Sequence, residues 1–389
     1  LQMARAALLL LLPILVLANE PPPPEKTTVT LDKKTVLVLF GTRHGNRNPE
    51  KFVNVPGRTW GSEGPLELTN IGKRQAFGLG KEVRAFIGKK YISTDYKADQ
   101  AKFFSSSANR CKMTLQSALA GLFDTSKWPG WNKEKLGLET PIPYTIDDPM
   151  LRMYSVKGCV NSDNAWAPIS KDTLPDLKEL VEKSKPLLDY MKEKDGRDPT
   201  ISNAADIADN IINMDFYNAT YPEWLSHPTL AKYTAATIKK AFLSFAENHM
   251  NKCAAHKPCR EMMGGLWANH IITSLEAAAA GKATTKLIGY ASHTEVTLSV
   301  MIVLGIHKSE LTTSAGFVIE LRNSTPPVVR ILQHDPNPID EHVIYPANLV
   351  PELASRTVKG WTPLSALKEY VTKAAFSDWE CTCGIKCKN

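Results

Sequence analysis

The segment GTRHGNRNP, residues 41–49, places Arg43 and Arg47 around His44. Both cationic side chains favour the neutral form of the imidazole, because a further positive charge beside them is unfavourable. A neutral imidazole is a nucleophile, and phosphorus is among its targets. Guanidinium groups match phosphoryl oxygens in geometry and charge. The segment is therefore predicted to hold a phosphate around the nucleophile His44. A basic surface turn is the alternative that these residues alone leave open.

The elements around this segment indicate an α/β protein. The apolar run 35–40 before it predicts a strand buried on both faces, as in a parallel sheet. Two further predicted strands, 102–104 and 286–291, also lead into polar turns and then into helical patterns. Repeated strand–turn–helix units predict a central, mostly parallel sheet flanked by helices. The ends of these three strands are expected to meet at one pocket.

The middle of the chain has a different character. Residues 151–262 are predicted to be mainly helical and to form a cap domain inserted into the core. The α/β core would then comprise residues 19–150 and 263–389.

The first residues have the pattern of a secretory signal peptide, predicted over 1–18: Arg5, an apolar run and then Ala18. A membrane anchor is the alternative, but the run is shorter than the roughly 20 residues of a transmembrane helix. We therefore predict a secreted, extracellular protein that does not bind membranes. Export also favours glycosylation at the two Asn-X-Thr sequons, Asn218 and Asn323.

The net charge of +7 suits an anionic substrate. The Lys and Arg residues are spread along the chain without a basic block, so a nucleic-acid partner is not expected.

The pattern R-H-G-x-R-x-P after an early strand resembles the signature of the histidine acid phosphatases, the branched group of the histidine phosphatase superfamily. Other segments are similar to parts of the same family, most of all to secreted insect members that include venom acid phosphatases. These segments are LTNIGKRQ (68–75), NRCKM (109–113), NATYPEW (218–224), Ser292-His293 and DWEC (378–381).

The resemblance implies roles for the matching residues. His44 would become phosphohistidine, while Arg43, Arg47, Arg110 and His293 would hold the phosphate. It also implies a helical cap over the site and no metal or other cofactor. The expected substrate is a small phosphate monoester or a phosphopeptide, and a homodimer is left open. Because an anion is expected among the arginines, they should lack a full set of carboxylate partners.

The second motif departs from the family pattern, in which His is followed by an Asp that protonates the leaving oxygen. Here Thr294 follows His293, and a threonine hydroxyl is not an acid at ordinary pH. Glu295 could serve instead, as in the related inositol polyphosphate phosphatases. The alternative is that Ser292 and Glu295 form an S-x-x-E capping box.

The chain contains seven cysteines, an odd number, so at least one is unpaired in a monomer. The resemblance implies a Cys159–Cys381 disulfide. Cys111, where many relatives have threonine, is the best candidate for the unpaired thiol. For the others we favour the local bridges Cys253–Cys259 and Cys383–Cys387. A zinc site is the alternative for a neighbouring set of residues: His249, Cys253, His256 and Cys259.

Three functions remain open at this stage. The sequence favours an active secreted phosphomonoesterase. A phosphate-site homologue that binds ligands with little turnover is the second possibility, because the acid position is altered. An inositol polyphosphate phosphatase is the third.

Overall fold

A computed structural model describes residues 22–123 and 142–387. The predicted signal peptide, residues 1–18, lies outside the described residues. No helix in the described ranges is long and apolar enough to cross a membrane.

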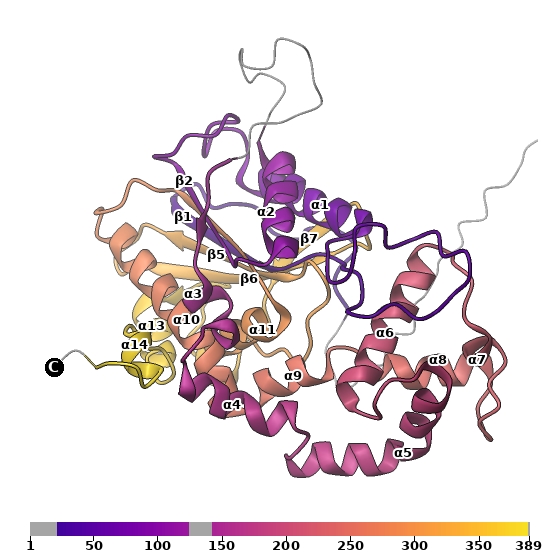
Figure 1. Ribbon diagram of the computed structural model, residues 1–389. Helices are drawn as coiled ribbons and strands as arrows, with labels where there is room; N and C mark the ends of the chain where they lie inside the picture. The colour runs from indigo at the N-terminus through magenta and orange to yellow at the C-terminus, as the bar shows by residue number, and fades with distance from the viewer. Residues whose placement is uncertain (1–21, 124–141, 388–389) are drawn as a thin grey trace, which may run out of the picture.

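The described chain is organised around one mixed sheet (Figure 1). The strands follow the order β3-β2-β4-β1-β5-β6-β7, and β8 pairs with β6. The strands β3, β2, β4 and β1 are mutually parallel, whereas β5, β6 and β7 continue the sheet with antiparallel pairs. The predicted α/β class with a central sheet and flanking helices is confirmed. The strand bounds are Thr35–Arg43 (β1), Ala101–Ser105 (β2), Thr145–Ile146 (β3), Leu287–Ser292 (β4), Gly316–Arg322 (β5), Val328–Pro336 (β6), His342–Pro346 (β7) and Thr362–Pro363 (β8).

Helices cover both faces of this sheet (Figure 1). On one face α1 (Asn70–Ile87) and α2 (Asn109–Leu122) pack on Val38 and Phe40 of β1. On the other face α10 (Lys257–Ala279), α11 (Thr294–Val303) and α13 (Leu364–Val371) pack with Leu37 and Leu39. Alternate residues of β1 thus enter two different cores, which explains why the run is apolar throughout. Short helical segments complete this part: α3 (Asp148–Leu151), a 3₁₀ turn (Met153–Ser155), α12 (Pro351–Ala354) and α14 (Trp379–Thr382).

The segment between Leu151 and α10 is helical and has an apolar core of its own. That core also takes in Val53 and Trp60 from the loop that follows β1. We retain residues 151–262 as a proposed inserted segment, although α10 begins inside this range. Its helices are α4 (Val160–Ser170), α5 (Pro175–Asp195), α6 (Ile201–Phe216), α7 (Glu223–Ser226), α8 (Ala235–Leu243) and α9 (Asn248–Ala255).

The disulfides confirm two sequence predictions and correct two others. Cys253–Cys259 forms and Cys111 is free, as predicted. The bridge to Cys159 comes from Cys383 rather than Cys381, and Cys381 pairs with Cys387. The reason is helical geometry at α14, where residues two positions apart point about 200° away from each other. Cys383 is fully buried and faces Cys159, whereas Cys381 is partly exposed. Because Cys253 and Cys259 are bonded to each other, their sulfurs are not available for the zinc alternative.

Candidate active site

The predicted site residues follow strands that are neighbours in the sheet. Arg43 at the end of β1 is paired in register with Ser292 at the end of β4. Ser105 at the end of β2 is next to β4 on its other side. The residues that come next are therefore brought together, and the ring centroids of His44 and His293 lie 5.7 Å apart. This is the carboxyl edge of the parallel half of the sheet, where α/β proteins commonly bind ligands.

The imidazole of His44 is buried and held in one tautomer. Its Nδ1 lies 2.8 Å from the carbonyl oxygen of Gly45. A carbonyl oxygen only accepts hydrogen bonds, so Nδ1 carries the proton and Nε2 keeps its lone pair. Burial lowers the pKa of His44 well below its ordinary value, and the charges of Arg110 and Arg43 lower it further. His44 is therefore a neutral imidazole with a nucleophilic nitrogen.

A close backbone contact fixes the turn that carries His44. A β-carbon on Gly45 would lie only 2.4 Å from the carbonyl oxygen of Gly72 in α1. The N-terminus of α1 is in turn capped by Thr69, whose hydroxyl accepts from Gly72 N and donates to Asn46. The glycines at 45 and 72 thus allow the loop to lie directly against the start of α1.

His293 is also buried, and it is held by two side chains from the β2–α2 region. Arg110 Nη2 donates to His293 Nδ1 at 3.1 Å, so Nε2 carries the proton and donates to Ser106 Oγ at 2.9 Å. Burial, followed by the charges of Arg110 and Arg152, lowers the pKa of His293 well below its ordinary value. The ring of Tyr154 packs edge-on against His293, with centroids 5.6 Å apart.

Two of the three predicted arginines have carboxylate partners from the inserted segment. Arg43 Nη2 is bonded to Glu247, and its Nη1 donates to the carbonyl oxygen of Leu311 at 2.5 Å. Arg47 Nη2 lies 2.9 Å from Asp209. Among the described residues, Arg110 forms no such ion pair. The expectation that the three arginines lack a full set of carboxylate partners is therefore met, because one of the three, Arg110, has none among the described residues.

Glu247 and Asp209 were missed because neither belongs to a recognisable motif. A signal for Asp209 was nevertheless present, since Asp206, Asp209 and Asn213 recur at helical spacing in an otherwise apolar sequence. In α6 this polar stripe contacts the loop after His44. Asp206 accepts from the backbone N–H of Glu50, and Asn213 donates to the carbonyl oxygen of Arg47. No comparable spacing pointed to Glu247.

Glu295 is buried at the second position of α11, with 6% of its surface exposed. The helix begins after His293, which makes no side-chain capping bond, and Ser292 belongs to β4 instead. The hydroxyl of Ser292 donates to the carbonyl oxygen of Leu151. The capping-box alternative is therefore wrong. Burial raises the pKa of Glu295, and the nearby carboxylate of Glu247 raises it further.

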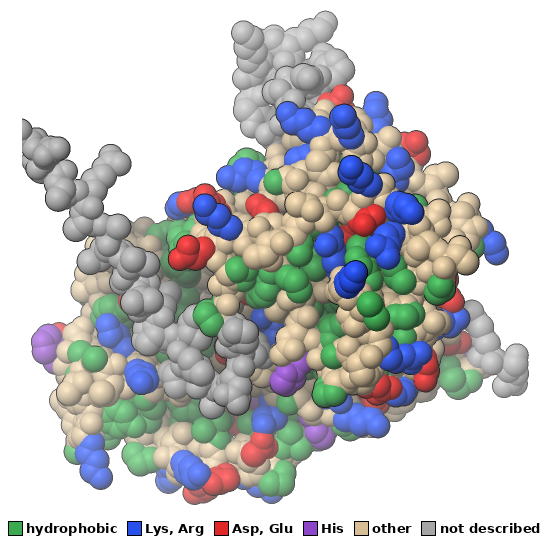
Figure 2. Space-filling view, turned by 180° about the vertical axis from the view of Figure 1, so that it is seen from behind, with side chains coloured by type: hydrophobic (Ala, Val, Ile, Leu, Met, Phe, Trp, Pro, Cys, Tyr) green, Lys and Arg blue, Asp and Glu red, His purple; other side chains and the backbone are tan. Residues whose placement is uncertain are grey.

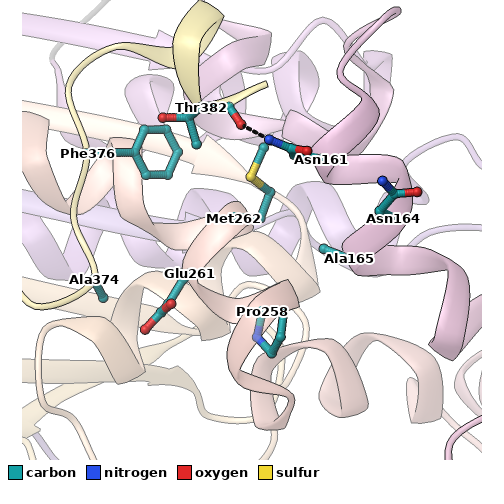
Figure 3. A pocket seen from close by; sticks show the side chains of 9 residues that line it. All are labelled: Asn161, Asn164, Ala165, Pro258, Glu261, Met262, Ala374, Phe376 and Thr382. Carbon is teal, nitrogen blue, oxygen red and sulfur yellow. Dashed lines mark hydrogen bonds between the residues drawn. The ribbon is translucent and has the colours of Figure 1, made fainter. Parts of the chain in front are cut away.

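A groove elsewhere on the molecule is chemically different from this site (Figure 3). It lies between α4, α10 and the C-terminal segment, where Asn161 donates to the carbonyl oxygen of Thr382 at 2.7 Å. Its lining side chains include neither arginine nor histidine: Asn161, Asn164, Ala165, Pro258, Glu261, Met262, Ala374, Phe376 and Thr382. It is therefore not suited to hold a phosphate. On the face drawn in Figure 2, basic side chains lie among acidic and hydrophobic ones.

The family model and the sequence relatives agree on one family. The model of the histidine phosphatase superfamily (branch 2) matches residues 28–318. The chain is 23% identical to prostatic acid phosphatase of Bos taurus over 370 residues, which cover 88% of this chain and 86% of that one. It is 33% identical to a venom acid phosphatase of Apis mellifera over 113 residues, 27% of this chain and 28% of the relative. A phytase of Hafnia alvei solved with tartrate has a similar fold, with a TM-score of 0.63, 14% identity, and coverage of 90% of this chain and 98% of the phytase.

Proposed function

Because this chain belongs to branch 2 of the histidine phosphatase superfamily, we propose that it hydrolyses phosphate monoesters through a phosphohistidine on His44. The observation that carries the proposal is the hydrogen bond from His44 Nδ1 to the Gly45 carbonyl. It keeps the proton on Nδ1 and leaves Nε2 free to attack phosphorus. The relatives named as acid phosphatases support the same reaction.

The proposed reaction has two steps. His44 Nε2 forms a bond to phosphorus as the ester P–O bond breaks, and the leaving oxygen takes a proton. Water then attacks the phosphohistidine, the P–N bond breaks, and inorganic phosphate is released. We assign the binding of the phosphoryl oxygens to Arg110 and His293, together with Arg43 and Arg47. The arginines supply the positive charge, so the reaction can proceed without a metal ion.

We propose Glu295 as the acid that protonates the leaving oxygen. Its raised pKa favours the protonated form, which a proton donor requires. The side chains of Tyr154 and Arg110 interact with it, which associates its carboxyl group with the residues around His293. During hydrolysis of the phosphohistidine, the resulting carboxylate would take a proton from the attacking water.

We also propose that the protein is secreted and glycosylated. Asn218 and Asn323 are both exposed, so a glycan could be attached at either without entering the core.

A catalytically impaired, ligand-binding homologue is the second candidate. Thr294 follows His293 where the family has an acid. This departure would be expected if the phosphate site had been kept for binding alone.

The test is hydrolysis of an aryl phosphate across pH, with His44→Ala as the control. We expect turnover in the acidic range, and His44→Ala should lower it by on the order of 10⁵-fold. A rapid alkaline quench should trap a phosphorylated protein whose label maps to the peptide containing His44. Equal turnover by the two proteins would reject the enzyme, and phosphate binding without turnover would support the binder.

A further inference from the structure

Two carboxylates from the inserted segment hold arginines that the core supplies for phosphate. Glu247 is paired with Arg43, and Asp209 is paired with Arg47. All four side chains are at most 17% exposed, so these are not solvated surface ion pairs. Among the described residues, Arg110 forms no ion pair with a carboxylate of the inserted segment.

The backbone at Glu247 is unusual for a residue with a side chain. Its φ is 56°, in the left-handed region, immediately before α9. This conformation is unfavourable for residues other than glycine, and it persists only where the surroundings impose it. Here it places a carboxylate against Arg43. One of the carboxylate oxygens, Oε2, is buried without a hydrogen-bond partner among the described residues. A residue other than glycine that is held in this backbone region calls for a functional explanation.

The arginine groups that suit a phosphoryl oxygen are the same groups that these carboxylates use. Arg43 Nη1 is committed to the Leu311 carbonyl and Nη2 to Glu247, which leaves Nε as its unpartnered nitrogen. Arg47 Nη1 donates to the carbonyl oxygen of Asn48, and Nη2 faces Asp209. A phosphate that takes an Nη2 group must displace a carboxylate or bind beside it, and two anions repel each other at that distance.

We propose that Glu247 and Asp209 are built-in competitors for substrate phosphate: they occupy Arg43 and Arg47 in the free protein and limit how tightly the site binds phosphate. This inference rests on the proposed function, because it concerns the same site. It assigns to the inserted segment a role in specificity. By offsetting two of the arginine charges, the segment favours substrates with one phosphate over those with several.

The competition should depend on pH, because a carboxylate that gains a proton no longer opposes an anion. Glu247 is faced by Arg43 and Arg47 from the β1 end, by Thr294 and Glu295 of α11, and by Asp209 of α6. The two arginines outweigh burial and lower the pKa of Glu247. Asp209 faces Arg47, Glu247, Asp206 and Arg43, and burial raises its pKa to about 6. As pH falls through about 6, Asp209 gains its proton first and should oppose a bound anion less.

The experiment measures binding of inorganic phosphate by calorimetry at pH 5 and pH 7.5, so it requires no turnover. Neutral Glu247→Gln and truncated Glu247→Ala should both bind phosphate about 10-fold more tightly at pH 7.5. Asp209→Asn should also bind more tightly at pH 7.5, but its gain should shrink at pH 5. Asp340→Asn is the matched control, because it neutralises a carboxylate that pairs with an exposed arginine, Arg74. The phosphate affinity of this variant should equal that of the unmodified protein.

The outcomes separate competition from a positioning role. If Glu247 serves to orient Arg43, Glu247→Ala should weaken binding while Glu247→Gln preserves it, and the proposal is overturned. Unchanged affinity in both variants overturns it as well. Should Glu247→Ala fail to fold, Asp209→Asn tests the same competition on Arg47, and an unchanged affinity there at pH 7.5 would count against it. If the unmodified protein shows no turnover and these variants bind phosphate more tightly, the competition is supported and the proposed enzyme is rejected.

Discussion

The core and the inserted segment contribute opposite charges to one site. The core supplies His44, His293 and the site arginines, whereas the inserted segment supplies Asp209 from α6 and Glu247 from the turn before α9. The part of the site that comes from the core, here called the core half, is built on buried parallel strands, which hold their ends in a fixed register. The part that comes from the inserted segment, the inserted half, depends on a packed helix and one unusual backbone conformation. The comparison suggests that chemistry resides in the core half and that the inserted half tunes binding.

The strongest test of this division concerns Glu295, the acid that we assign to the core half. Glu295→Gln should lower the rate about 10²- to 10⁴-fold on alkyl phosphates, whose leaving oxygen needs a proton. An aryl phosphate with a strongly acidic phenol should lose far less, because its leaving group departs as an anion. Rates on the two substrates check this prediction. An equal loss on both would mean that Glu295 does not deliver the proton.

The arginines provide a second test, since among the described residues Arg47 forms an ion pair with a carboxylate and Arg110 forms none. Arg110→Met should weaken phosphate binding about 100-fold, because a hydrogen bond to a charged group contributes about 1.5–3 kcal/mol. Arg47→Met should weaken it about 10-fold, since part of the charge of Arg47 is already used by Asp209. Phosphate dissociation constants measured by calorimetry at pH 7.5, where Asp209 is ionised, give both losses. The reverse ranking would contradict the division between the two halves.

The Cys159–Cys383 bridge joins the start of the inserted segment to the C-terminal region across 224 positions. Replacing both residues by alanine should lower the free energy of unfolding by about 5 kcal/mol, because the unfolded chain loses a long closed loop. Replacing Cys381 and Cys387, which are six positions apart, should cost about 2 kcal/mol. Denaturant unfolding of the two double variants makes the comparison. Equal losses of unfolding free energy would show that loop length does not determine how much each disulfide stabilises the protein.

The smallest effect is expected at Cys111, which lies beside the proposed catalytic groups of the core. Its thiol is 3.5 Å from His293 Nε2, but burial raises its pKa to about 11. At neutral pH it is therefore a protonated thiol, and the thiolate is the reactive form. We expect iodoacetamide at pH 7 to leave activity unchanged and to label Cys111 only after denaturation. Rapid inactivation of the native protein would show that the thiol is accessible.

The sequence predicted the core half of the site much better than the inserted half. The residues around His44, Arg110 and His293 follow apolar strands, and adjacent parallel strands bring their ends together whatever the intervening chain does. The contact between Glu247 and Arg43 instead depends on how a helical segment packs onto the core, and no local pattern records that. The predicted Cys159–Cys381 pairing was wrong because Cys381 and Cys383 lie on opposite sides of a short helical turn. Only Cys383 is on the buried side, and the spacing of the cysteines in the sequence does not reveal which side is buried.

The order in which the cysteines are synthesised adds a consequence for how this fold is reached. Cys159 leaves the ribosome well before Cys383, whereas Cys253 and Cys259 become available in between. In an oxidising compartment the first partners that Cys159 meets are therefore the wrong ones. Correct pairing requires that Cys159 stay reduced until the C-terminal region emerges, or that an early bridge be exchanged by a disulfide isomerase. Yield of native protein should therefore depend on the thiol-exchange capacity of the host in which it is produced.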